Sequence, residues 1–171
     1  GGGINILDPT TGNITVLEHI SGDNHSLPTN TILCLHSDSA GNIWAGSKRE
    51  GVINIREVSM RTYTNVVLGH NKGLSQSTVL QLYQEPASEE LWIATDGGGI
   101  NKFIPSTETF VHYPDTWGDK MVSITGFTPN ELLVSAFSKG IFIFDKKTGK
   151  KRPFAIMSPS LEHHIRYSGQ P

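Results

Sequence analysis

Residues 77–104 read STVLQLYQEPASEELWIATDGGGINKFI, and their apolar positions recur in NTILCLHSDSAGNIWAGSKREGVINIRE at residues 30–57. Trp92 aligns with Trp44, so the two copies are 48 residues apart, with one extra residue near the first turn of the second copy. A fixed spacing of roughly 20–50 residues is typical of repeat proteins, in which each repeat buries its apolar face against its neighbours. The two copies therefore predict a fold built from similar units that pack side by side.

The repeat occurs a third time, and two incomplete copies flank the complete ones. Residues 121–145, MVSITGFTPNELLVSAFSKGIFIFD, keep the apolar pattern with Leu133 in place of the tryptophan. Asn54 of the first copy is aligned with Asn101 of the second, and Phe142 takes this position in the third. The opening GGGINILD matches only the end of the unit, and SLEHHIRYS near the end of the chain resembles its beginning.

Each copy reads as four short strands. The first alternates apolar and polar residues, the second is a continuous apolar run such as LWIAT, the third follows glycine, and the fourth is more polar and interrupted by proline. Four-stranded antiparallel sheets repeated every 40–50 residues or so are typical of a β-propeller. We therefore predict an all-β chain, a β-propeller segment of four-stranded antiparallel blades, with about three and a half blades of a seven-bladed propeller. The predicted organisation of residues 1–171 is the end of a blade (1–20), three blades (26–66, 74–113 and 120–156) and the start of the next (160–171).

Composition and charge exclude several classes of protein. The formal net charge of −2 gives no overall attraction to nucleic acid, so we expect no nucleic-acid contact. No apolar run approaches the roughly 18–20 residues that span a bilayer. The chain opens GGGINIL without an initiator methionine, so we expect it to begin within a longer protein. The single cysteine, Cys34, excludes an internal disulfide bond, and its place in the apolar alternation ILCLH favours a buried core residue.

Two stretches carry several linked motifs, SLPTNTILCLHSDSAGNIWAGSKREGVINI at residues 26–55 and GLSQSTVLQLYQEPASEELWIATDGGGINKF at residues 73–103. The motifs are a Ser-Leu-Pro-like linker, an alternating strand, Asp-x-x-Gly, a strand that bears tryptophan, and glycine before the next strand. Together they resemble the two-component regulator propeller repeat, and the resemblance covers nearly the whole chain. The chain departs from the pattern in the third copy, which lacks the tryptophan, and at residues 85–90, where EPASEE replaces the Asp-x-x-Gly turn.

The resemblance implies a function in signalling. Members of this family form the periplasmic sensor regions of hybrid two-component systems in Bacteroides-type bacteria, where the parent protein is anchored in the inner membrane and continues into a histidine kinase and a DNA-binding regulator. The chain is then expected to be a periplasmic, ligand-sensing segment, not itself an enzyme, that responds to oligosaccharides from polysaccharide breakdown. Two alternatives stay open: a propeller enzyme similar to the streptogramin lyases, and a structural propeller that mediates dimerisation without a ligand of its own.

The residue types that catalyse reactions or bind metals follow no ordered pattern. The glycines at 97–99 lack the Lys-Ser/Thr pair and the following helix of a phosphate-binding loop, and they separate two predicted strands, which favours a tight turn. The adjacent histidines His163 and His164 would point to opposite faces of a strand. The other histidines fall in different repeats, and no nucleophile elbow occurs. We expect no cofactor, no metal site and no catalytic residue.

A propeller gathers on one face the turns between second and third strands and the links between blades. Loops on a rigid scaffold are where binding residues concentrate, so we predict a ligand site on this face. Aromatic rings pack on the faces of sugars, and lysine or arginine pairs with carboxylate or sulfate groups, so an oligosaccharide is the expected ligand. The predicted ligand-binding residues are Lys48, Arg49, His70, Asp96, Trp117, Phe137 and Lys139.

A segment of a propeller leaves the outer faces of its first and last blades without a partner. Each face would expose an apolar patch at least as large as the roughly 300–600 Å² that is the maximum usual for a soluble monomer. We therefore expect the chain to associate with the remainder of its own propeller or with a second copy of itself, forming a homodimer.

Overall fold

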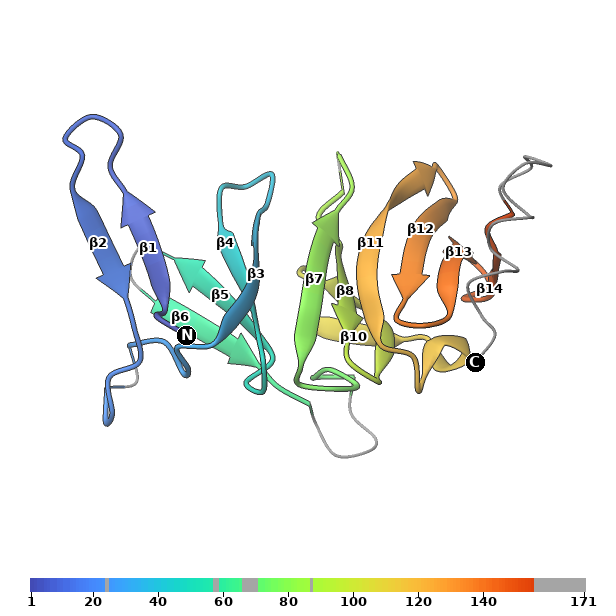
Figure 1. Ribbon diagram of the computed structural model, residues 1–171, viewed down its shortest axis with the longest axis horizontal. Helices are drawn as coiled ribbons and strands as arrows, with labels where there is room; N and C mark the ends of the chain where they lie inside the picture. The colour runs from blue at the N-terminus through green and yellow to red at the C-terminus, as the bar shows by residue number, and fades with distance from the viewer. Residues whose placement is uncertain (24, 57–58, 66–70, 87, 156–171) are drawn as a thin grey trace, which may run out of the picture.

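The computed structural model describes residues 1–171 except 24, 57–58, 66–70, 87 and 156–171 (Figure 1). The described residues form one antiparallel hairpin and three four-stranded antiparallel sheets, with almost no helix. This architecture confirms the predicted all-β propeller segment. The predicted start of a further blade at 160–171, which includes His163 and His164, lies outside the described residues. None of the helices in the described part has the length and apolar character needed to cross a bilayer.

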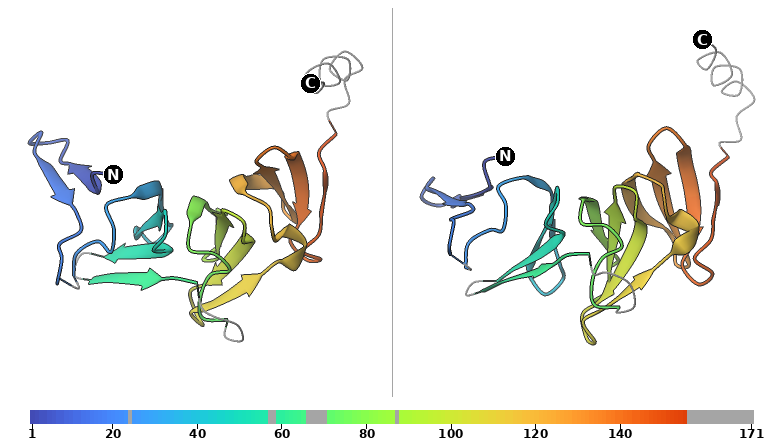
Figure 2. Two further views of the ribbon diagram at one scale, coloured as in Figure 1. Left: turned by 60° about the horizontal axis from the view of Figure 1, so that its bottom comes forward. Right: turned by 90° about the horizontal axis from the view of Figure 1, so that it is seen from below.

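The strands follow one another in each sheet in the order of the sequence. The hairpin consists of β1 (Ile4–Leu7) and β2 (Ile14–Leu17). The first blade comprises β3 (Ile32–Ser37), β4 (Ile43–Ser47), β5 (Val52–Arg56) and β6 (Ser59–Tyr63). The second comprises β7 (Val79–Gln84), β8 (Leu91–Thr95), β9 (Gly99–Ile104) and β10 (Thr109–His112), and the 3-10 turn η1 (Pro114–Thr116) follows it. The third comprises β11 (Met121–Thr128), β12 (Glu131–Ala136), β13 (Gly140–Asp145) and β14 (Lys151–Pro153). Figure 2 shows the hairpin and the three blades following one another along an arc.

Each junction between two complete blades contains a tryptophan, a tyrosine and a phenylalanine in contact with one another, and Phe110 adds a fourth ring at the first junction. At the first junction, the ring centroid of Trp44 lies 6.4 Å from that of Tyr63 in the same blade and 5.4 Å from that of Phe103 in the next. Edge-to-face and offset contacts of this kind stabilise a core beyond the area that the rings bury. The second junction repeats the arrangement, with centroid distances of 5.7 and 6.0 Å from the tryptophan. Its three residues are Trp92, Tyr113 and Phe144.

Turns of equal length keep the first and second blades in the same register. Asn54 lies opposite Trp44 across β4 and β5, whereas Lys102 lies opposite Trp92 across β8 and β9. The predicted alignment of Asn54 with Asn101 is therefore wrong by one residue. The reason is geometric: Ser47 pairs with Gly51 as Thr95 pairs with Gly99, so three residues turn the chain in both blades, and equivalent residues must follow the tryptophan at equal distances along the chain.

The third blade obeys the same register. Ile143, not Phe142, lies opposite Leu133 across β12 and β13, which corrects the predicted alignment of the third copy in the same way. Leu133 thus occupies the tryptophan position on the face of the third blade that no described blade covers, and it is partly exposed.

The outer faces of the end sheets are exposed at positions that the junctions bury. In each blade, a glycine lies at or just before the start of the third strand. The residue after this glycine is Val52 in the first blade and Ile100 in the second, and these side chains are 1% and 0% exposed. The equivalent residue of the third blade, Ile141, is 44% exposed. On the hairpin, Leu7 occupies the position that Phe103 takes in the second blade, and it is 60% exposed. Both ends of the segment therefore expose apolar side chains. In the junctions between blades, a neighbouring sheet covers the equivalent positions.

The Asp-x-x-Gly turn of the first blade positions the tryptophan of the following strand. Asp38 accepts hydrogen bonds from the backbone N–H groups of Ala40 (3.0 Å) and Asn42 (2.8 Å), from Asn42 Nδ2 (2.8 Å) and from Trp44 Nε1 (2.8 Å). Burial tends to raise the pKa of the Asp38 carboxyl, but these hydrogen bonds outweigh it and hold the pKa below its ordinary value. In the second blade, where EPASEE replaces this turn, Trp92 Nε1 is buried with no hydrogen-bond partner among the described residues.

Replacing Asp38 by alanine is expected to lower the free energy of unfolding by about 1–3 kcal/mol at neutral pH, because the Trp44 indole and the turn amides lose a charged acceptor. A carboxyl whose native pKa lies below its unfolded pKa stabilises the fold above the unfolded pKa, and this contribution disappears as pH falls through the native pKa. The difference between wild type and variant should therefore shrink below about pH 4. Urea unfolding over a pH series measures it, with the exposed Ser39→Ala change in the same turn as control. A difference that does not vary with pH would contradict this role of the carboxylate.

Cys34 lies on β3 and is partly rather than fully buried. Burial raises the pKa of its thiol to about 11, and the backbone hydrogen bond from Gly46 opposes this only in part. The thiol is therefore protonated at neutral pH and acts as a packing residue.

Candidate functional site

The predicted ligand face is formed by turns at one end of the blades. We call it the loop face, and in the described residues it comprises 48–51, 96–98, 117–120 and 137–139 (lower edge of the blades in Figure 1). Backbone hydrogen bonds tie the last three segments together. Gly97 N donates to Asp119 O (3.1 Å), Gly118 N donates to Gly97 O (2.8 Å), and Phe137 N donates to Lys120 O (2.8 Å). The second and third blades therefore share one continuous, hydrogen-bonded loop surface.

The three consecutive glycines form the tight turn between β8 and β9. Gly97 and Gly99 have φ angles of 91° and 70°, in the left-handed region that glycine adopts without strain. A Cβ on Gly99 would lie 2.1 Å from Thr116 Oγ1, which accepts a hydrogen bond from Ile100 N (2.9 Å). The chain continues into strand β9 and not into a helix, so the glycines bring the turn against η1 and do not form a phosphate-binding loop.

An exposed aromatic ring and a pair of opposite charges lie side by side on this surface. Lys120 Nζ is 3.0 Å from Asp96 Oδ2 and 5.7 Å from the centroid of the Phe137 ring. Phe137 and Trp117 are 65% and 55% exposed. Exposed aromatic side chains beside a cation and a carboxylate can pack on an apolar ligand face while the charged groups bind its polar substituents.

A buried carboxylate supports the same surface from beneath. Asp119 is 1% exposed and pairs with Lys139 and Lys151, whose side chains are 56% and 21% exposed. Burial lowers the pKa of Lys151, and the negative charge of Asp115 opposes this effect. Asp119 therefore fixes the position of Lys139 at the edge of the loop face while being inaccessible to a ligand itself.

The structure brings some of the predicted ligand-binding residues together and separates others. Lys48 and Arg49 lie in the turn between β4 and β5, one blade away on the same face, and His70 lies outside the described residues. Sequence reasoning missed Lys120, although it lies only three residues after the predicted Trp117, in the same loop. The residues that the structure brings together, which with Lys120 we call the loop-face patch, are Asp96, Trp117, Phe137 and Lys139.

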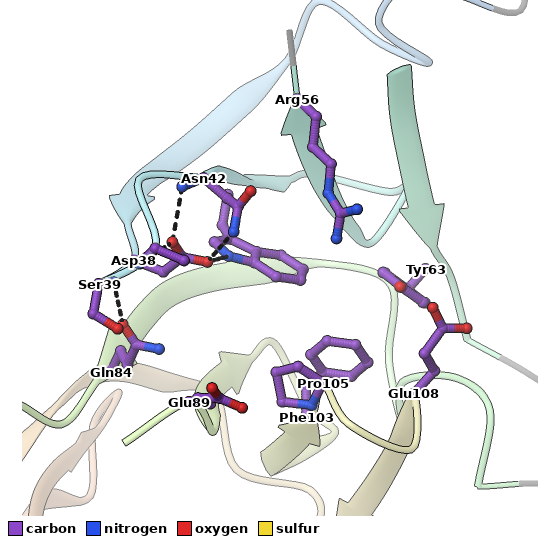
Figure 3. A pocket seen from close by; sticks show the side chains of 12 residues that line it. Asp38, Ser39, Asn42, Arg56, Tyr63, Gln84, Glu89, Phe103, Pro105 and Glu108 are labelled. Carbon is purple, nitrogen blue, oxygen red and sulfur yellow. Dashed lines mark hydrogen bonds between the residues drawn. The ribbon is translucent and has the colours of Figure 1, made fainter. Parts of the chain in front are cut away.

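A second concave site lies at the opposite rim, between the first and second blades (Figure 3). This inter-blade pocket has a volume of about 420 Å³, and its walls come from the β3–β4 turn, the β7–β8 loop and the β9–β10 turn. The aromatic side chains of the first junction form part of its lining, together with polar groups. Its charged residues are Asp38, Arg56, Glu89 and Glu108.

The charged groups of the inter-blade pocket differ in how far they are already paired. Arg56 Nε donates to Asn54 Oδ1 (2.8 Å), and Glu108 pairs with Arg61. Glu89 makes no hydrogen bond or ion pair within the described part of the chain. Sequence patterns do not reveal this pocket, because its walls come from two repeats and depend on how these repeats pack. In the ranges that the structure describes, no three His, Cys, Asp or Glu side chains are grouped so as to hold a metal ion.

Comparisons with known proteins agree with this architecture. Residues 26–49 match the family model described as two component regulator propeller. No curated protein sequence matches the chain. Among solved structures, the extracellular domain of BT3049, assigned as a hybrid two component system of B. thetaiotaomicron, is similar with a TM-score of 0.77 and 19% identity, over 91% of this chain and 22% of that one.

Two further structures share the fold. PorZ, a surface component of the type-IX secretion system of Porphyromonas gingivalis, has a TM-score of 0.58 at 15% identity, over 90% of this chain and 24% of that one. The computationally designed protein Ika8 also has a TM-score of 0.58, at 17% identity, over 88% of this chain and 42% of that one. The chain thus spans less than a quarter of the BT3049 and PorZ chains that it resembles. The resemblance that the motifs indicated is confirmed: the chain is a β-propeller segment that carries a two component regulator propeller repeat at residues 26–49.

Proposed function

We propose that the chain is a ligand-sensing segment of the extracytoplasmic region of a hybrid two-component system. The propeller repeat at residues 26–49 and the similarity to the extracellular domain of BT3049 support this class of protein. The observation that carries the proposal is the loop-face patch, where the rings of Trp117 and Phe137 are exposed on hydrogen-bonded turns that also carry the paired Lys120 and Lys139. On this proposal, the chain lies in the periplasm and belongs to a protein anchored in the inner membrane.

The proposed ligand is an oligosaccharide. A sugar ring presents C–H groups that pack on aromatic faces, and its hydroxyl, carboxylate or sulfate groups bind lysine and carboxylate side chains. The patch offers both kinds of contact within one hydrogen-bonded surface, since Lys120 lies between Asp96 and Phe137. Binding transmits a signal only if the ligand has a higher affinity for one arrangement of the sensor than for another.

The proposed partner of the segment is a further set of blades, from the remainder of its own propeller or from a second copy in a homodimer. Ile141 on the last blade and Leu7 on the hairpin are exposed at positions that the two junctions bury, which supports this proposal. Apolar patches of this kind on a soluble protein usually mark an interface.

The test of the ligand site is a titration of the intact extracytoplasmic region with oligosaccharides, including uronic-acid-containing and sulfated fragments. The double change Trp117→Ala and Phe137→Ala is expected to weaken binding at least about tenfold, since each tenfold loss corresponds to about 1.4 kcal/mol and large aromatic contacts contribute more than this. Calorimetry measures the affinity, and Phe127→Ala, an exposed aromatic residue on the third blade at the opposite rim, is the control. Unchanged affinity in the double variant would remove the loop-face patch as the site, and metal-dependent turnover of a substrate would contradict a purely sensory segment.

A further inference from the structure

The space beside the second aromatic junction is filled by ammonium groups of the chain itself. Lys102 Nζ lies 5.6 Å from the centroid of the Trp92 ring and 2.9 Å from Glu90 Oε1. Lys146 reaches into the same region and pairs with Glu85. A cation over a tryptophan face and beside a carboxylate gains both cation–π and ion-pair stabilisation. At this junction, the protein supplies these cations from its own side chains.

The first junction has the same aromatic framework without the two lysines. By strand register, Asn54 occupies the position of Lys102, opposite the tryptophan. Pro105 occupies the position of Lys146, because each lies two residues beyond the phenylalanine that inserts at its junction. Both replacements are shorter and uncharged. The inter-blade pocket of about 420 Å³ lies at this junction, and both Trp44 and Pro105 line it.

The charge of the inter-blade pocket favours a cation. Its lining holds the carboxylates of Asp38, Glu89 and Glu108 and the guanidinium of Arg56 (Figure 3). Asp38 already accepts hydrogen bonds from the turn amides and from the Trp44 indole, and Glu108 pairs with Arg61. Glu89 is the carboxylate that keeps its full hydrogen-bonding capacity within the described residues. An incoming ammonium group would find there the carboxylate that Glu90 provides to Lys102 at the second junction.

We propose that the inter-blade pocket binds a small organic ligand through a protonated primary amine, which takes the place of the Lys102 ammonium beside the tryptophan of the first junction. The ligand class is an amino sugar or a short alkylamine. The amine lies against the Trp44 ring and pairs with Glu89, and the rest of the ligand occupies the space that Lys146 fills at the second junction. This site is at the rim opposite the loop-face patch and does not depend on an oligosaccharide binding there.

The test follows the Trp44 indole N–H signal of the full chain by nuclear magnetic resonance during titration with two probes, glucosamine and 1,5-diaminopentane. N-acetylglucosamine, which has the same ring without the cation, is the matched control ligand. We expect saturable shifts at Trp44 with an amine and none with N-acetylglucosamine. Shifts with glucosamine alone support the proposal with an amino sugar as the ligand, and shifts with both probes support it with the ammonium group as sufficient. Equal shifts with N-acetylglucosamine, or no shift with either amine at high millimolar concentration, would overturn the proposal.

Two variants separate binding in the pocket from binding elsewhere. Glu89→Gln is expected to weaken amine binding about threefold, the effect of losing one ion pair to an exposed carboxylate, whereas Glu18→Gln, the same chemical change at an exposed position outside the pocket, should leave it unchanged. Asn54→Lys should supply the missing ammonium from the chain and abolish binding, while the remaining resonances show that the fold persists. If Asn54→Lys does not fold, the Glu89→Gln comparison still decides. Amine binding that is equal in wild type and Glu89→Gln would contradict the assigned contact.

Discussion

Replacing Trp92 by alanine is expected to lower the free energy of unfolding by about 3–5 kcal/mol, the usual cost of deleting a large aromatic side chain from a core. Trp92 is 1% exposed and its ring contacts Tyr113 and Phe144, so the variant would leave a cavity between the second and third blades. The strands that bear Trp92 and Phe144, β8 and β13, are each paired on both sides within their sheets and cannot readily collapse into such a cavity. Denaturant unfolding followed by circular dichroism measures the change.

The repeat provides a matched control for this prediction. Leu133 occupies the tryptophan position of the third blade, on a face that no described blade covers. Leu133→Ala is expected to cost only about 1 kcal/mol, because part of the side chain is already in contact with water and no enclosed cavity forms. Equal losses for the two variants would show that the tryptophan position stabilises each sheet separately and not the junction between blades.

Replacing Asp119 by alanine is expected to lower the free energy of unfolding by about 2–4 kcal/mol. Removing one partner of a buried ion pair costs about 3–5 kcal/mol, and the exposure of Lys139 reduces this value. The carboxylate is 1% exposed, and Lys151, the less exposed of its two partners, would lose its counter-charge. The third blade should be affected most, because Lys139 and Lys151 both belong to it.

The control for Asp119 is an exposed ion pair on the same face. Asp96 and Lys120 form a pair 3.0 Å long whose side chains are more than one-third exposed. Asp96→Ala should therefore change the free energy of unfolding by less than about 1 kcal/mol, as exposed ion pairs generally do. A loss for Asp119→Ala as small as that for Asp96→Ala would contradict the structural role of the buried carboxylate.

Much of the fold could be predicted from the sequence because each repeat consists of local sequence patterns that are typical of strands and turns. Alternating apolar residues, the LWIAT run and the glycine turns specify strands wherever they occur, so β7, β8 and β9 lie where the motifs place them. Register could not be predicted as well. The alignment of Asn54 with Asn101 treated two asparagines as equivalent, whereas hydrogen bonding across the strands depends only on the length of the turn.

The residues of the candidate sites could be predicted only where they lie in loops that contain a distinctive residue. Trp117 stands out as a tryptophan outside any strand, and the structure places it in the loop-face patch. The inter-blade pocket and the pairing of Asp119 with Lys151 depend on contacts between residues far apart in the sequence. The sequence does contain the difference between the two junctions. The second junction has Lys102 and Lys146, whereas the first has Asn54 and Pro105 at the equivalent positions. That difference becomes meaningful only once the register is known.

The most direct test of the proposed sensor function is to locate the bound oligosaccharide by hydrogen exchange and mass spectrometry on the intact extracytoplasmic region. Residues 96–98, 117–120 and 137–139 are expected to exchange more slowly in the presence of the ligand, because contacts that order a loop suppress its local opening. The turns at 8–12 and 145–149, on the opposite rim, should be unaffected. Protection of the opposite rim without any change at the loop-face patch would contradict the proposal that this patch binds the ligand.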